Sequence, residues 1–292
     1  MVLGVLAVVL SGAYYWLILE VPAPPGRWKL DMAEVRRLAQ SLPGDRPREI
    51  RVERVSDFKF PGAITRAGAG WGWLQMSVYS YQLVFPSHTA IIDTGLNEPI
   101  PGGTLDRASY GRVSKALSAA DLIVITHEHF DHLGGLVAQP NLAALLKVAR
   151  LTQEQVSYPD RLSPGKFPPG ALDGYQPLDY DRAVAVAPGV VLVRAPGHTP
   201  GSQLVYVLRA DGTEYLFLGD VAWRELNVTE PRERPRLSAL LIKEDRGNVT
   251  DQLTELHRLA QSEPRVHQVP GHDPAVVDRF IAEHLLEAGF GP

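Results

Sequence analysis

The strongest constraint on this sequence is a group of metal-binding side chains that follows an apolar stretch. Residues 122–125 are apolar, and the next ten residues read Thr-His-Glu-His-Phe-Asp-His-Leu-Gly-Gly. The candidate ligands in this run are His127, His129, Asp131 and His132. Because α/β sheets carry their sites beyond the carboxyl ends of strands, a strand ending here would present all four at one sheet edge. We therefore expect a metal site.

Three further residues of the ligand type also stand at the ends of predicted strands. They are His198 in Pro-Gly-His-Thr, Asp220 in Phe-Leu-Gly-Asp and His272 in Pro-Gly-His-Asp. Each is a weak signal alone, but together they supply enough ligands for two metal ions. Asp93, in Ile-Ile-Asp-Thr-Gly, ends another predicted strand. One interpretation of Asp93 is an ordinary turn residue at the end of a strand.

Composition narrows the chemistry of such a site. The chain has 292 residues and no cysteine, which excludes disulfides, thiolate metal sites and a cysteine nucleophile. Histidine and carboxylate ligands suit zinc, with iron or manganese as alternatives. The net charge is −4 and the basic residues are scattered, so we expect a small-molecule substrate and no nucleic acid partner.

The pattern of short apolar runs and amphipathic segments predicts an α/β fold. Strands are expected over 50–55, 78–85, 89–93, 122–126, 190–195, 203–208, 214–218 and 266–269. Helices are expected over 32–40, 249–261 and 274–287, with long loops over 68–73 and 159–177. Strands interleaved with helices in two successive groups indicate sheets whose faces are covered by helices.

From about residue 49 to 292, the sequence resembles the metallo-β-lactamase superfamily, through all its metal motifs in order. The resemblance implies an α/β four-layer αβ/βα sandwich with the metals at one sheet edge. It implies two zinc ions, whose ligands are His127, His129 and His198 for one, Asp131, His132 and His272 for the other, and Asp220 for both.

The same resemblance assigns roles to individual residues. A metal-bound hydroxide would attack the substrate, and Asp131 would orient the attacking water or pass its proton to the leaving group. Asp93 matches the superfamily's first-motif aspartate, which would contact a metal ligand without binding the metal itself.

Departures from the family pattern reduce the number of reactions that the chain is expected to catalyse. True β-lactamases generally lack a residue like Asp220, so that activity becomes a minor alternative. The motif set is similar to those of acyl-homoserine lactonases and glyoxalase II, yet lactonases commonly carry Tyr where this chain has Trp223. We expect a dizinc hydrolase of an ester, lactone or thioester. The alternatives are a mononuclear-iron oxidoreductase similar to persulfide dioxygenases, a phosphodiesterase, and a non-enzymatic metal-stabilised binding module.

Residues 2–19 form an uncharged apolar segment that is long enough to span a bilayer. We expect residues 1–21 to be a membrane anchor or uncleaved signal, 22–48 a Pro-rich spacer with a short helix, and 49–292 the hydrolase domain. Arg27 and Lys29 follow the segment and no basic residue precedes it, which favours a cytoplasmic catalytic domain. This anchor, together with Trp71, Trp73 and Trp223 as possible pocket residues, suggests a rather apolar substrate.

Overall fold

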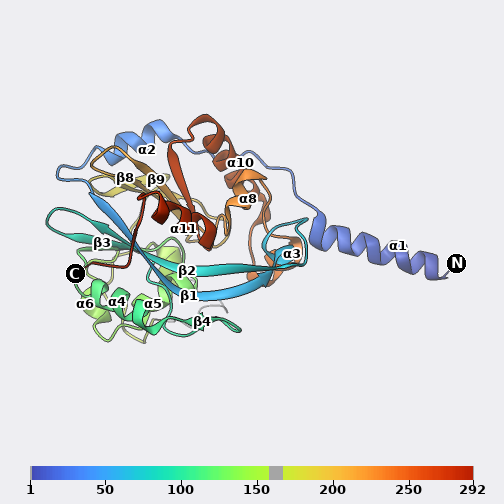
Figure 1. Ribbon diagram of the computed structural model, residues 1–292, viewed down its shortest axis with the longest axis horizontal. Coiled ribbons are helices and arrows are strands. Elements are labelled where there is room, and N and C mark those ends of the chain that lie inside the picture. Colours follow the sequence, from blue (N-terminus) through green and yellow to red (C-terminus); the bar gives the residue numbers. More distant parts are fainter. Residues whose placement is uncertain (1, 158–166, 292) are drawn as a thin grey trace.

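The computed structural model describes residues 2–157 and 167–291 and contains two sheets packed face to face (Figure 1). The first sheet has the order β11-β1-β2-β3-β5, with β4 paired to β1. Its strands are β1 (Glu49–Pro61), β2 (Trp73–Val84), β3 (Thr89–Ile92), β4 (Thr104–Leu105), β5 (Leu122–Val124) and β11 (Glu287–Ala288). β1 and β2 pair antiparallel over their whole length, from Glu49–Val84 to Pro61–Trp73, and form a long hairpin.

The second sheet has the order β10-β9-β8-β7-β6. Its strands are β6 (Ala183–Ala187), β7 (Val190–Arg194), β8 (Gln203–Leu208), β9 (Glu214–Gly219) and β10 (Val266–Pro270). β9 and β10 run parallel, so their carboxyl ends lie side by side. Every residue of β8 is buried, because this central strand is covered on both faces.

Helices surround the two sheets. They are α2 (Met32–Ala39), α3 (Gly62–Thr65), α4 (Arg107–Leu117), α5 (Phe130–Val137), α6 (Leu142–Leu145), α7 (Gln153–Ser157), α8 (Glu225–Thr229), α9 (Arg236–Ile242), α10 (Arg246–Ser262) and α11 (Pro274–Ala282). Helices α4, α5 and α6 share one core with the first sheet, and α2 and α10 share another with the second. A third core, with Leu83 and Phe217, lies between the sheets. The predicted four-layer sandwich is confirmed.

Several elements differ from the sequence prediction. β1 continues to Pro61 rather than ending at residue 55, because β2 pairs with it along its full length. Helices α4 and α5 and strand β6 were not expected. α11 ends at Ala282 instead of residue 287, because His284 takes a left-handed conformation (φ 57°) and the chain folds back on Phe280. Of the expected loop over 159–177, residues 159–166 lie outside the described part of the chain.

The chain begins with α1 (Val2–Tyr14), which continues into a π-helical turn, η1 (Tyr15–Leu19). Together they are long and apolar enough to cross a membrane. α1 leaves the body beside α3 and projects away from it (Figure 1). η1 instead contacts α9, and its Ile18 is buried.

Candidate metal centre

The loop between β5 and α5 carries the four clustered ligands. β5 ends at Val124 and α5 begins at Phe130, so His127 and His129 lie in the loop while Asp131 and His132 lie in the first turn of the helix. All four side chains are buried. The carboxylate of Asp93 holds this loop, because it accepts hydrogen bonds from Thr126 N (2.6 Å) and Thr126 Oγ1 (2.8 Å).

The other three residues come from the second sheet. His198 follows β7, Asp220 follows β9 and His272 follows β10, and all three are buried. Gly219 allows the end of β9 to approach the loop, since a Cβ at this position would lie 2.7 Å from the Cβ of Thr126. The ends of strands from both sheets thus meet at one site.

The structure brings all seven predicted ligands together in two groups. One group contains His127, His129, His198 and Asp220, and the other contains Asp131, His132 and His272. Asp220 faces both groups: its Oδ2 lies 3.2 Å from His198 Nε2, and its Oδ1 lies 3.3 Å from His132 Nε2 and 3.1 Å from His272 Nε2. Asp220 thus offers one carboxylate oxygen to each group.

The electrostatics of the site favour positive charge. Burial opposes ionisation of Asp220, but the imidazoles of His272, His127 and His132 hold its pKa well below the ordinary value. Burial also opposes the charged form of His132, yet Asp131, Asp93 and Asp220 raise its pKa well above the ordinary value. The buried carboxylates therefore require compensating positive charge.

The donor atoms also fit a metal. Within the described chain, His132 Nε2 and Asp220 Oδ1 are buried and make no hydrogen bond. A buried polar atom that makes no hydrogen bond is costly, and coordination to a cation would satisfy both atoms. Five imidazoles and two carboxylates are a donor set that zinc, iron and manganese accept.

Three imidazoles are held in orientation by hydrogen bonds that their Nδ1 atoms donate on the side away from the centre. His132 Nδ1 donates to Asp93 Oδ2 (2.8 Å), His198 Nδ1 to Glu244 Oε2 (2.8 Å) and His272 Nδ1 to the Ser77 carbonyl (2.9 Å). Such bonds leave each Nε2 to face the centre. Asp93 is in the position the sequence suggested. Glu244 and Ser77 were missed, because only the tertiary fold brings them to the histidines.

A buried polar network connects two of the ligands. Arg234 donates from Nε to Glu244 Oε2 (2.7 Å), and its guanidinium lies 4.7 Å from the centre of the Trp223 ring. Trp223 in turn donates from Nε1 to Asp220 Oδ2 (2.6 Å). His198 and Asp220 are therefore linked through Glu244, Arg234 and Trp223.

A cavity of about 440 Å³ adjoins the centre. Its walls are mainly apolar and come from Phe58, Phe60, Ile64, Ile100, Pro101, Phe130, Trp223, Leu241 and Ile242. Asp131 and Asp220 also reach it. Of the three tryptophans considered from the sequence, Trp223 lines the cavity, whereas Trp71 and Trp73 lie on the surface and are 53% and 69% exposed.

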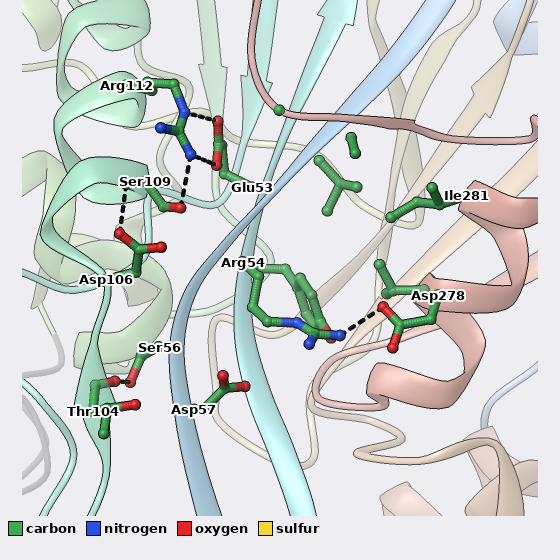
Figure 2. Close-up of a pocket in the computed structure, with 15 residues that line it drawn as sticks. Glu53, Arg54, Ser56, Asp57, Thr104, Asp106, Ser109, Arg112, Asp278 and Ile281 are labelled. Carbon is green, nitrogen blue, oxygen red and sulfur yellow. Dashed lines mark hydrogen bonds and ion pairs between the residues drawn. The ribbon is translucent and has the colours of Figure 1, made fainter.

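A second cavity of about 420 Å³ lies between β1, α4 and α11 (Figure 2). Its arginines pair with carboxylates: Arg112 binds Glu53 with two nitrogens, and Arg54 Nη2 donates to Asp278 Oδ1 (2.7 Å). No histidine lines it. Among the described residues, the ligand groups thus adjoin the first cavity.

Comparison with known proteins agrees with this geometry. The family model of the metallo-beta-lactamase superfamily matches residues 73–288. The fold is similar to that of an N-acyl homoserine lactone hydrolase with the product N-hexanoyl-L-homoserine at its catalytic metal centre (TM-score 0.61, 15% identity, covering 80% of this chain and 96% of that one). No curated protein matches the sequence.

Two other solved structures share the fold at similarly low identity. One is a dizinc quorum-quenching lactonase (TM-score 0.52, 15% identity, covering 78% of this chain and 89% of that one). Another is a probable metal-dependent hydrolase from Staphylococcus aureus (TM-score 0.55, 14% identity, covering 79% and 91%). The family match spans most of the sequence, so this chain belongs to the metallo-β-lactamase superfamily, and the predicted class of metal-dependent hydrolase is confirmed.

Proposed function

We propose that the chain hydrolyses an ester, lactone or thioester bond of a small, partly apolar substrate at a two-zinc centre. The observation that carries this proposal is Asp220, whose two carboxylate oxygens face two groups of ligands beside an apolar cavity. A complete second group, Asp131, His132 and His272, supports two ions rather than one. His127, His129 and His198 would hold the first ion and this second group the other, with Asp220 shared.

When bound, the zinc ions supply Lewis-acid activation of the scissile carbonyl and a water that ionises near neutral pH. The protein's contribution to proton transfer is Asp131. This residue lines the cavity, and its Oδ2 lies 3.5 Å from His272 Nε2. Its carboxylate can therefore accept a proton from the attacking water and deliver it to the leaving group.

The substrate's apolar part would lie against Phe58, Phe60 and Trp223. Trp223 carries one N–H, which it donates to Asp220, so it offers no hydrogen bond to a substrate oxygen. Its role is to position Asp220 and to supply an apolar wall. The lactone hydrolase with a bound N-hexanoyl product shows that this fold can accommodate an acyl chain at its metal centre, which supports the substrate class proposed for this chain.

Turnover by the zinc-loaded protein tests the proposal. We expect hydrolysis within a panel of acyl lactones, esters and thioesters, with longer acyl chains preferred. At saturating zinc, Asp131→Asn should lower kcat by about 10²- to 10⁴-fold, the range for general acid–base residues. The exposed Asp211→Asn serves as the control. Absence of turnover across the panel, or one iron per chain with oxygen consumption, would contradict the proposal.

We also propose that α1 and η1 anchor the chain in a membrane. The segment Val2–Leu19 has the length and hydropathy of a spanning helix, and only 6% of it is buried. A cleaved signal sequence would pass the same criteria, so the experiment is the mass of the mature protein. Recovery of the intact chain from alkali-washed membranes supports an anchor, whereas loss of the first residues contradicts it.

A further inference from the structure

The base of the N-terminal helix is fastened to the catalytic domain rather than joined by a free linker. The Glu20 carboxylate accepts hydrogen bonds from Arg236 Nη2 (2.8 Å) and Arg246 Nη1 (2.6 Å). The Arg236 guanidinium lies 4.6 Å from the centre of the Trp16 ring, and Gly68 N donates to the Ile18 carbonyl (3.1 Å). These contacts fix the direction in which the helix leaves the domain.

Exposed apolar side chains surround this base. Trp71 donates from Nε1 to the Tyr14 hydroxyl (3.1 Å), which places the loop before β2 against the helix. Trp73 begins β2 and is 69% exposed, and Leu240 in α9 is 62% exposed. Tryptophan and tyrosine are enriched where membrane proteins cross the bilayer interface. We call Trp71, Trp73, Leu240 and Leu241 the apolar rim.

The same rim borders the cavity of the metal centre. α9 binds the base of the anchor through Arg236 at its first residue, and its last residues, Leu241 and Ile242, line the cavity. Ile64 of α3 lines the same wall, and Ser238 Oγ donates to its carbonyl (2.8 Å). One short helix thus connects the anchor to the cavity wall.

We propose that the apolar rim rests on the bilayer, so that the cavity receives its substrate from the membrane. The bilayer is the occupant that the molecule itself indicates, because the helix proposed above to span a bilayer leaves the domain beside this rim. The substrate class would be an acyl amphiphile dissolved in the bilayer, with its scissile carbonyl at the metal centre and its chain toward Leu241 and Ile242. The substrate part of this inference rests on the proposed hydrolase function, whereas the orientation rests only on the proposed membrane anchor.

Site-directed spin labelling of the full chain in phospholipid nanodiscs tests the orientation. Because the sequence has no cysteine, a single cysteine gives a label without background. We expect the label at Leu240→Cys to be relaxed by oxygen and shielded from a water-soluble nickel chelate. The matched control is exposed Lys115→Cys in α4, which lies on the side away from α1 in Figure 1 and should show the reverse.

Equal nickel access at both labels would overturn the orientation. Shielding of Leu240→Cys from both reagents, with dipolar coupling between labels, would also overturn it, because a second copy of the chain would then cover the rim. If the labels behave as expected but no ester, lactone or thioester is hydrolysed, the function fails and the orientation stands. Normal hydrolysis with an aqueous Leu240 label contradicts the orientation alone.

Kinetics test the substrate route. The double variant Trp73→Asp, Leu240→Asp changes the rim without touching residues that line the cavity. We expect turnover of a long-chain ester embedded in the nanodisc to fall about tenfold or more, since two apolar side chains in contact with lipid are replaced by charged ones. Turnover of a short water-soluble ester should stay within about twofold. An equal loss on both substrates would contradict a membrane route.

Discussion

Glu244 is the residue on which the orientation of His198 depends. Its Oε2 accepts hydrogen bonds from His198 Nδ1 (2.8 Å) and Arg234 Nε (2.7 Å) in a fully buried position. Glu244→Gln keeps the shape of the side chain but removes its charge. We therefore expect zinc affinity to fall about 10- to 100-fold, the usual effect of losing the hydrogen-bond partner of a metal-binding histidine. Chelator competition measures this. Glu230→Gln, which changes an exposed pair with Arg66, is the control, and unchanged affinity in Glu244→Gln would refute the role.

Glu233 should make stability depend on pH. Burial raises its pKa to about 7, although Arg246 acts to lower it, whereas the ordinary value is 4.5. Below pH 4.5 the folded and unfolded states both hold the proton. Between pH 4.5 and 7 the folded state keeps the proton of Glu233 and the unfolded state releases it. The stability that this proton contributes is therefore lost as the pH rises, which lowers the free energy of unfolding by at most about 3 kcal/mol.

Glu233→Gln cannot ionise and should remove that part of the pH dependence. Urea unfolding of both metal-free proteins at pH 5 and pH 7 gives, for each protein, the change in the free energy of unfolding with pH. We call this change the pH slope. The comparison uses the change with pH because the substitution also alters the contact with Arg246 and so shifts the free energy of unfolding itself. Identical slopes would show that Glu233 ionises normally in the folded state.

The ligands could be predicted from the sequence, but most of their partners could not. His127, His129, Asp131 and His132 stand in one short run, and the other ligands follow recognisable strand ends. Glu244 lies 46 residues from His198 within an ordinary polar stretch, and Ser77 contributes only a carbonyl. Nothing local in the sequence distinguishes such residues, because their contacts exist only after the two sheets have packed.

At the scale of elements, the close approach of α5 to the loop after β3 sets the position of Asp131 and His132. A Cβ at Gly135 would lie 1.9 Å from the Thr94 carbonyl oxygen, whereas a Cβ at Gly134 would meet only ordinary contacts from 3.8 Å. Gly135→Ala must push α5 away from the first sheet. We expect it to destabilise the protein by about 3 kcal/mol or more and to weaken zinc binding.

Gly134→Ala is the matched control, because it adds the same methyl group one residue earlier in the same helix. It should be neutral or stabilise slightly, since alanine favours helix by about 1 kcal/mol over glycine. Urea unfolding and zinc titration of both variants make the comparison. Similar behaviour of the two alanine variants would contradict the argument from close packing.

Element types were more predictable than element lengths. Alternating and apolar runs correctly indicated the central strands of both sheets, because burial there dictates composition. The extension of β1 to Pro61 depends on pairing with β2, a contact that local pattern does not contain. Helix α4 was missed although Asp106 caps it by accepting from Ala108 N and Ser109 N, since its apolar face is narrow.

At the scale of the whole molecule, the sandwich could be predicted because the metal motifs occur in family order, and the family match confirms it. The direction of the N-terminal helix could not. It depends on Glu20, which lies 216 residues from Arg236 and 226 residues from Arg246 and meets them only in the folded chain. The apolar character of the cavity likewise arises from residues of β1, α3 and α9 that share no local pattern.

The metal content of the full chain tests the two-metal centre most directly. It is measured after reconstitution with zinc and removal of excess metal. Mass-spectrometric metal analysis should find two zinc ions per chain, and hydrolysis of an acyl ester or lactone should rise with occupancy. His127→Ala should lose metal and activity together. A single tightly bound ion at full activity, or full zinc occupancy in His127→Ala, would contradict the account.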